Sequence, residues 1–414
     1  MPSFFTGHPT DSLLPSQQIA AAVARVLEPN PLYEDAENRH PLQYGTDPGS
    51  EYVRQQFAAF SNKTLGGTAR ADCLNLTNGA SYGAASALLL LCDPSITKHA
   101  FLVSPTYFLI NTVFMDAGFA GRMTAIVQED DLDFETLERE LESRAAGAPT
   151  LPLNELGSPQ APHGLKKFQF VMYLVPTFSN PGGTTLSLSQ RQRLLAIARK
   201  YDMLLLCDEV YEWLDFGGDP HYPLLVTLDR ETLPAGSIGH VVANFSMSKV
   251  LGPGLRVGWQ EAATPELAAM LCQSGAIISG GTPAQFNTYI VADLMKTGAI
   301  FSIIDKINQA FRSRAEVYLK VLNQGLPKGS AIAGGKGGYF IWVTLPVGYN
   351  VEKITQLAKD QGVVLAPGKH FEVSGDPKGW GERCFRFSLS LLDSPEALPA
   401  LDKFIQAVSQ SKLE

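Results

Sequence analysis

The stretch Asn244–Trp259, NFSMSKVLGPGLRVGW, brings a lysine amine, two serine hydroxyls and an arginine close together. An isolated Ser-Lys pair is more typical of a solvated loop. However, Lys249 can form an imine with an aldehyde, and burial or a neighbouring cation lowers the pKa of such an amine toward neutrality. Ser246, Ser248 and Arg256 supply the hydroxyl donors and the planar cation that suit a phosphate dianion. The stretch therefore predicts a covalent site for a phosphorylated aldehyde.

A second phosphate site is indicated upstream, in LTNGASYGAASALLLL. This pattern predicts a strand, a glycine-containing turn and an apolar helix. The free backbone N–H groups of Gly79, Ala80 and Ser81 at the start of that helix would form an anion cradle. Alone, such a loop is a weak signal for phosphate.

Pyridoxal phosphate carries both an aldehyde and a phosphate, and further residues suit its ring. Its chemistry needs a carboxylate against the ring nitrogen, which Asp208 could supply. Tyr211 and Asn180 could donate to the ring phenolate, and Tyr107 could stack on the ring face. Taken singly, Asp208 is more typical of a helix N-cap and Tyr107 of core packing. Their common order and placement favour one cofactor site.

The elements that must position these groups are short apolar runs separated by helical patterns. Continuous apolar runs with helices between them indicate parallel strands buried on both faces, and hence an α/β domain. The runs cover 74–78, 99–105, 122–128, 168–176, 203–209 and 240–248. Five of them end on polar or ionisable residues. Ligands bind beyond the carboxyl ends of such strands, so one shared site would collect them.

The chain changes character after about residue 285. A long helical pattern over 287–326 precedes strand-like segments at 337–346, 363–371 and 384–390, which predicts a smaller α+β domain. We expect an N-terminal segment 1–30 that packs on the small domain or the substrate site, a large domain 31–290 and a small domain 291–414. A segment rich in Pro, Gly and Ala, 145–167, is expected to be an exposed excursion.

Composition narrows the function classes further. With 414 residues, 45% apolar content and a formal net charge of -8, the chain reads as globular and has no dense basic run, so nucleic acid is an unexpected partner. No signal peptide or membrane span is predicted. Five cysteines without a CxxC pair suggest neither a metal site nor a disulfide framework, and favour a reducing, cytoplasmic location. The terminal SKL at 411–413 would be a peroxisomal signal, but Glu414 follows it.

These motifs resemble fold-type I pyridoxal-phosphate enzymes of the aspartate aminotransferase superfamily, class I/II, nearest the 2-aminoadipate and kynurenine aminotransferase branch. The resemblance spans almost the whole chain. It is carried by LTNGASYG, SPTY, YLVPTFSNPGG, CDEVY and SMSKVLGPGLRVGW, and by GGYFIWVTLP, VVLAPGKHF and FRFSLS in the smaller domain; SFFTGHP and LQYGTDPGSEYVRQQFAAF match more loosely. It implies a large domain with a mostly parallel, seven-stranded-type sheet between helices, plus a smaller α+β domain.

The resemblance also implies a role for each matching residue. Lys249 would hold the cofactor covalently and then move the proton between the substrate Cα and the cofactor. Asp208 would pair with the ring nitrogen, and Arg386 would clamp the substrate α-carboxylate as a bidentate pair. Without the resemblance, Arg386 would read as a strand residue in a surface ion pair. The phenolate partners would be Tyr211 and Asn180, and the phosphate partners Ser246, Ser248, Arg256 and Gly79 to Ser81.

Family members form homodimers with active sites at the subunit interface. Tyr44 would then reach the other subunit's cofactor phosphate, and Ser279–Gln285 would lie near the same interface. Gly7 and His8, in the N-terminal segment, would contact the substrate. His8 departs from the apolar residue usual in the branch, which leaves the accepted side chain open.

Three functions remain open on the sequence. The leading one is an aminotransferase moving an α-amino group to a 2-oxo acid through pyridoxamine phosphate. The same scaffold also performs β- or γ-elimination, C–S cleavage, decarboxylation or cyclisation of modified amino acids. A ligand-sensing regulator is disfavoured, because only a few dozen residues without a basic recognition helix precede the fold.

Overall fold

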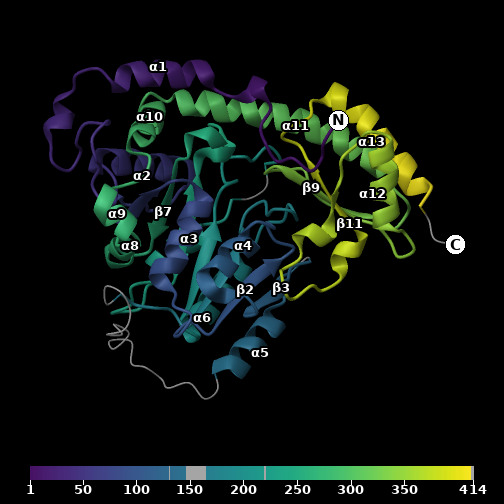
Figure 1. The fold of residues 1–414 in the computed structure, drawn as a ribbon, viewed down its shortest axis with the longest axis horizontal. Coiled ribbons are helices and arrows are strands. Elements are labelled where there is room, and N and C mark those ends of the chain that lie inside the picture. Colours follow the sequence, from purple (N-terminus) through teal and green to yellow (C-terminus); the bar gives the residue numbers. More distant parts are fainter. Residues whose placement is uncertain (130, 146–164, 219–220, 412–414) are drawn as a thin grey trace.

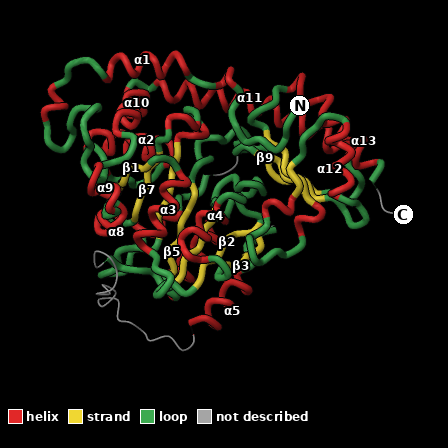
Figure 2. The backbone as a smooth tube through the Cα atoms, in the orientation of Figure 1, coloured by secondary structure: helices red, strands yellow, loops and turns green. Residues whose placement is uncertain are grey.

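A computed structural model describes residues 1–129, 131–145, 165–218 and 221–411. It contains a seven-stranded sheet flanked by helices and a separate four-stranded sheet beside it (Figures 1 and 2). The predicted α/β fold with a mostly parallel seven-stranded sheet is confirmed. Most of the predicted excursion at 145–167, and the SKL lysine and leucine, lie outside the described residues.

Six strands of the large sheet run in one direction and one runs against them. The order is β1-β7-β6-β5-β4-β2-β3, and β7 is the strand that runs opposite to the other six. The strands are β1 (Leu74–Thr77), β2 (His99–Ser104), β3 (Met123–Val127), β4 (Phe170–Leu174), β5 (Met203–Asp208), β6 (Val241–Ser246) and β7 (Gly258–Ala262). Each apolar run of the sequence forms one of the six aligned strands, so their carboxyl ends share one edge.

Strand β7 was not predicted. It reads GWQEA, and its two polar residues Gln260 and Glu261 are both buried. Gln260 donates to the Gly83 carbonyl and Glu261 pairs with Arg230 at 2.6 Å. The apolar pattern is absent because hydrogen bonds, rather than hydrocarbon, satisfy these buried positions.

Helices cover the large sheet on both sides. They are α2 (Glu51–Leu65), α3 (Ala80–Leu91), α4 (Ile110–Phe114), α5 (Phe134–Ala145), α6 (Leu188–Lys200), α7 (Leu225–Glu231), α8 (Pro265–Leu271) and α9 (Gly275–Gly280). Local chemistry fixes where some of them begin. Helix α6 starts with a capping box, in which Ser187 and Gln190 each bond to the other's backbone N–H.

The single long helix expected over 287–326 is wrong. The structure has two helices, α10 (Gln285–Lys296) and α11 (Ala299–Gly325), separated at Gly298. Gly298 has φ +76°, a left-handed conformation that ends one helix before the next begins. Helix α10 packs on α1 (Ser16–Val26) and α2, whereas α11 continues toward the small sheet (Figure 1).

The small sheet is antiparallel throughout, in the order β10-β11-β9-β8. Its strands are β8 (Ala331–Gly334), β9 (Phe340–Thr344), β10 (Ala366–Pro367) and β11 (Cys384–Ser388), with helices α12 (Val351–Asp360) and α13 (Ser394–Ser409). Figure 1 shows α12 and α13 on the same side of this sheet. Strand β8 was not predicted, since Ile332 is the single large apolar side chain among its four residues AIAG.

The N-terminal segment touches both parts of the molecule. Helix α1 (Ser16–Val26) packs along α10, where Arg25 pairs with Asp293 at 2.5 Å. Before it, the backbone of Phe4 bonds to Val364 and Ser388, beside the small sheet. The domain boundaries at residues 30 and 290 stay predictions. No helix of the described chain is long and apolar enough to cross a membrane.

Candidate active site

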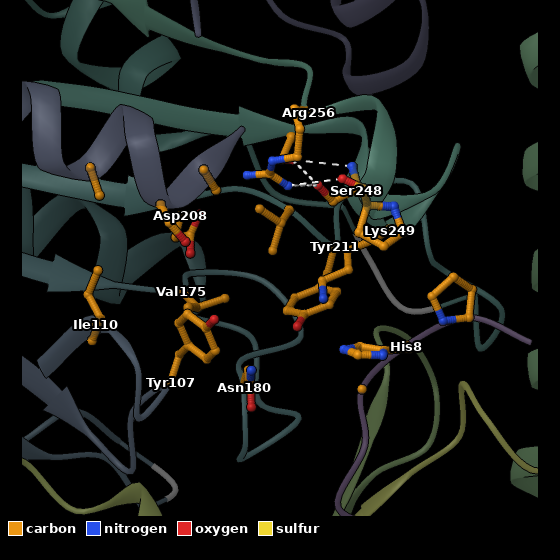
Figure 3. Close-up of a pocket in the computed structure, with 18 residues that line it drawn as sticks. His8, Tyr107, Ile110, Val175, Asn180, Asp208, Tyr211, Ser248, Lys249 and Arg256 are labelled. Atoms are coloured by element: carbon orange, nitrogen blue, oxygen red, sulfur yellow. Dashed lines mark hydrogen bonds between the residues drawn. The ribbon is translucent and has the colours of Figure 1, made fainter. Parts of the chain in front are cut away.

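A cavity lies beyond the carboxyl ends of the aligned strands, where the sequence placed the shared site (Figure 3). Residues of the N-terminal segment and residues of the large domain both line it. The predicted residues among them are Gly7, His8, Ala80, Ser81, Tyr107, Asn180, Asp208, Tyr211, Ser246, Ser248, Lys249 and Arg256. The structure therefore brings most of the predicted site together around one cavity.

Lys249 ends a short 3₁₀ turn, Met247–Lys249, that follows β6 directly. Its amine lies 5.1 Å from the ring centroid of Tyr339, whose hydroxyl donates to the Lys249 carbonyl at 2.9 Å. Burial, and then the charge of Arg386, lower the pKa of the Lys249 amine to about 8. A useful fraction of this amine is thus neutral, and nucleophilic, near neutral pH.

Asp208 is the last residue of β5 and lines the cavity. Its Oδ2 accepts a 2.7 Å hydrogen bond from the Tyr173 hydroxyl, while its buried Oδ1 has no hydrogen-bond partner among the described residues. Burial raises the pKa of the Asp208 carboxyl to about 6, against the bond from Tyr173 and the charge of Lys249. The free oxygen suits an N–H donor arriving in the cavity.

The hydroxyls and the guanidinium of the opening stretch meet at the other end of the cavity. Ser246 Oγ donates to Ser248 Oγ at 2.9 Å, and Arg256 Nη1 approaches the same Oγ at 3.5 Å (Figure 3). Arg256 Nη2 donates to the Asn78 carbonyl at 3.0 Å. A Cβ on Gly79 would lie 2.6 Å from that Nη2, and Gly79 has φ +86°, so this position favours glycine. Gly79 thus adjoins the cavity without lining it.

Tyr107, Tyr211 and Asn180 lie on the opposite wall (Figure 3). The Tyr107 hydroxyl interacts with Ser81, and burial raises its pKa. Burial also raises the pKa of Tyr211 well above its usual range, so Tyr211 is a hydrogen-bond donor. The Oδ1 of Asn180 accepts from Arg386 Nη1 at 2.9 Å, which leaves its amide N–H groups to donate.

Arg386 is held on β11, next to the cavity rather than among its lining residues. It is 3% exposed, and its guanidinium lies 4.1 Å from the ring centroid of Phe340 and 4.5 Å from that of Phe371. Its Nη2 donates to the Phe5 carbonyl at 2.5 Å, while its Nε has no partner among the described residues. Two ring faces and two hydrogen bonds fix this cation beside Asn180.

Tyr44 is not brought to the cavity. Its side chain is 75% exposed, and it does not line the site within this chain. The backbone around it packs on the other segment expected near an interface: Gly45 contacts Thr282 and Gln285.

Sequence reasoning missed several residues at the site. The most consequential are Tyr173, which bonds to Asp208, and Tyr339, which flanks Lys249. Both stand in quoted motifs, YLVPTFSNPGG and GGYFIWVTLP, but no role was assigned to either tyrosine there. The other lining residues are Pro9, Ala84, Ile110, Val175, Val210 and Pro253. No cluster of metal-ligating side chains occurs in the described parts of the chain.

Comparisons with known proteins agree on one family. A family model described as aminotransferase class I and II matches residues 9–404. An uncharacterized protein of Saccharomyces cerevisiae is 44% identical, over 94% of this chain and 93% of its own length. A 2-aminoadipate transaminase of Thermus thermophilus is 28% identical, over 94% of this chain and 86% of its own. The solved structure of the α-aminoadipate aminotransferase LysN, also from Thermus thermophilus, superposes with a TM-score of 0.75 at 26% identity, covering 99% of this chain and 92% of that one.

Proposed function

This chain belongs to the aminotransferase class I and II family and is a pyridoxal-phosphate-dependent transaminase, and we propose the residues that perform its reaction. In this proposal Lys249 bonds to the cofactor, Asp208 faces its ring nitrogen and Arg386 binds the substrate carboxylate. The single observation that carries it is the convergence of a low-pKa amine, a buried carboxylate and a hydroxyl–guanidinium cluster on one cavity.

The side chains fit the cofactor. The unpartnered Oδ1 of Asp208 calls for an N–H donor such as a protonated ring nitrogen. At the other end, Ser246, Ser248 and Arg256 offer donors to a phosphate, together with the first N–H groups of α3. Because the carboxylate and the cation lie at opposite ends, the two charged parts of the cofactor have one preferred orientation.

When bound, pyridoxal phosphate supplies an electron sink for the bond broken at the substrate Cα. The chain's own residues prepare that step. Asp208 keeps a proton on the ring nitrogen, and Tyr211 and Asn180 donate to the ring oxygen. Lys249, once displaced by the substrate amine, is a free base with a pKa near neutral and carries the Cα proton. Tyr107 covers the ring face.

The substrate groups have separate partners. Arg386 binds the α-carboxylate, which an amino acid and a 2-oxo acid share, so one arginine serves both half-reactions. Gly7 and His8 line the same cavity and would contact the side chain. We propose an α-amino acid donor and a 2-oxo acid acceptor, without choosing the side chain.

Incubation of the holoenzyme with a panel of amino acids tests this reaction. We expect the aminated cofactor to accumulate in the absence of acceptor, and a 2-oxo acid to reverse it. Continuous release of keto acid and ammonia without any acceptor would instead identify the elimination chemistry that the scaffold also permits.

We further propose a homodimer with the active site at the interface. The exposure of Tyr44, and the packing of its segment against Thr282 and Gln285, support a contact surface there. Sedimentation should give twice the mass of the chain, and Tyr44→Ala should weaken cofactor binding. A fully active monomer would exclude this arrangement.

We also propose a cytoplasmic location, since all five cysteines are unpaired and buried, which suits a reducing compartment. Cell fractionation checks this directly: recovery in a secreted or vesicular fraction would contradict it.

A further inference from the structure

Three buried amide side chains form a row across neighbouring strands beneath α3. Asn75 on β1 pairs in register with Gln260 on β7, and Gln260 pairs with Asn244 on β6. Directly paired residues of antiparallel strands point to the same face of the sheet. All three are 0% exposed. Burying amide side chains costs free energy unless they form hydrogen bonds, so the hydrogen-bond partners of this row indicate what it supports.

The row bonds to the first turn of α3, the helix that begins at the phosphate cradle. Asn244 Nδ2 donates to the Ala80 carbonyl at 2.8 Å, and Gln260 Nε2 donates to the Gly83 carbonyl at 2.7 Å. Asn75 Nδ2 in turn donates to Gln260 Oε1 at 2.9 Å, which orients that amide. Two carbonyls of one helical turn are therefore tied to two adjacent strands.

Two glycines allow this close approach. A Cβ on Gly83 would lie 2.2 Å from Asn244 Oδ1, and a Cβ on Gly258 would lie 3.0 Å from the Cα of Gly79. Neither glycine has a positive φ, so their backbone conformations do not demand glycine. A glycine inside a helix costs about 1 kcal/mol relative to alanine. Its presence at Gly83 fits a helix that must lie this close to the row.

We propose that Asn244 and Gln260 are positioning residues that set where the N–H groups of Gly79 to Ser81 meet the cofactor phosphate. Asn244 lies two residues before Ser246 on the same strand. The row thus connects both parts of the phosphate site, the start of α3 and the end of β6, to the same buried part of the sheet. This inference rests on the proposed cofactor site.

The test compares pyridoxal phosphate with pyridoxal, which lacks the phosphate, in titrations of the full-length apoprotein. The variants are Asn244→Leu and Gln260→Met, which keep side-chain size and remove the donors. We expect the dissociation constant for pyridoxal phosphate to rise about tenfold, the effect of one lost hydrogen bond to or near a charged group. The constant for pyridoxal should change less than about twofold, since Lys249 is intact.

Glu261→Gln is the matched control, because Glu261 is a buried polar residue on the opposite face of the same strand. The Glu261→Gln variant should change the dissociation constants for pyridoxal phosphate and for pyridoxal by the same factor, or leave both unchanged. Equal loss of both ligands in Asn244→Leu and Gln260→Met, or no loss at all, would overturn the inference and leave the row a structural feature.

A double variant guards against misfolding. Asn244→Ala with Gly83→Ala fills the space left by the amide and replaces a helical glycine, so it should be stable yet still lose phosphate selectivity. If it retains full selectivity, the row does not position the turn. Ser248→Ala tests the underlying proposal separately: if this variant binds pyridoxal phosphate as tightly as the wild type, the cofactor site itself is wrong.

Discussion

Arg386 Nη1 donates a 2.9 Å hydrogen bond to Asn180 Oδ1, and this bond joins the small sheet to the large one at the active site. Arg386 lies on β11, and Asn180 lies in the loop that follows β4. The proposed carboxylate clamp and a proposed partner of the cofactor ring are thus in direct contact. In the proposed site, substrate binding at Arg386 would be coupled to the cofactor through the Asn180 side chain.

Replacing Arg386 by lysine should raise the KM for both the amino acid and the 2-oxo acid about 10- to 100-fold, because a point charge cannot form the bidentate pair. Cofactor affinity should change little. Steady-state kinetics in both directions measures this.

Arg314→Lys is the control for the loss of a buried guanidinium. Arg314 is 5% exposed and bonds to the carbonyls of Leu389 and Ser390, away from the cavity lining. The Arg314→Lys variant should have lower thermal stability than the wild type and an unchanged KM. If both variants shift KM equally, Arg386 has no special role in binding the carboxylate.

The pKa of Lys249 makes cofactor capture depend on pH. The amine is nucleophilic only when neutral, and its pKa is lowered to about 8, first by burial and then by Arg386. The rate at which the apoprotein captures pyridoxal phosphate should rise with pH, with a midpoint near pH 8, and level off above it. In Arg386→Gln, the loss of a nearby positive charge should move that midpoint upward. A midpoint that stays fixed would show that Arg386 does not act on the amine.

Tyr173 should control the pH range over which the Asp208 carboxyl is ionised and can pair with the cofactor ring. The carboxyl pKa is raised to about 6, and the bond from Tyr173 favours its ionised form. Pairing with a protonated ring requires the carboxylate, so cofactor affinity should fall as pH drops through about 6. Tyr173→Phe removes the stabilising donor and should move this loss upward by about one pH unit.

Equilibrium titrations from pH 5 to 8 would detect the shift. Tyr339→Phe is a suitable comparison, because it removes a buried hydroxyl that donates to the Lys249 carbonyl and leaves the Asp208 bond intact. The same pH profile in wild type and Tyr173→Phe would refute the role given to this hydroxyl.

The sequence predicted which side chains gather around the cavity wherever these follow the ends of strands. Asp208, Ser246 and Lys249 follow apolar runs that form parallel strands, and parallel strands deliver their carboxyl ends to one edge. The predicted cluster could therefore be assembled without knowing the strand order.

What the sequence could not predict depends on contacts between distant segments. Strand β7 was hidden because Gln260 is buried by bonding to Gly83, 177 residues away in sequence. Tyr173 stood in the quoted motif YLVPTFSNPGG, but its bond to Asp208 depends on β4 and β5 pairing beside each other. The break at Gly298 was missed because the apolar pattern continues on both sides of it, although the glycine itself was visible.

The central claim is that Lys249 is the residue that bonds to the cofactor, and borohydride reduction of the holoenzyme tests it most directly. After reduction and digestion, mass spectrometry should find the phosphopyridoxyl group on the peptide containing Lys249. Lys249→Ala should carry no such group, whereas Lys369→Ala, which alters an exposed lysine paired with Glu352, should behave as the wild type. An unchanged reducible adduct in Lys249→Ala would contradict the account.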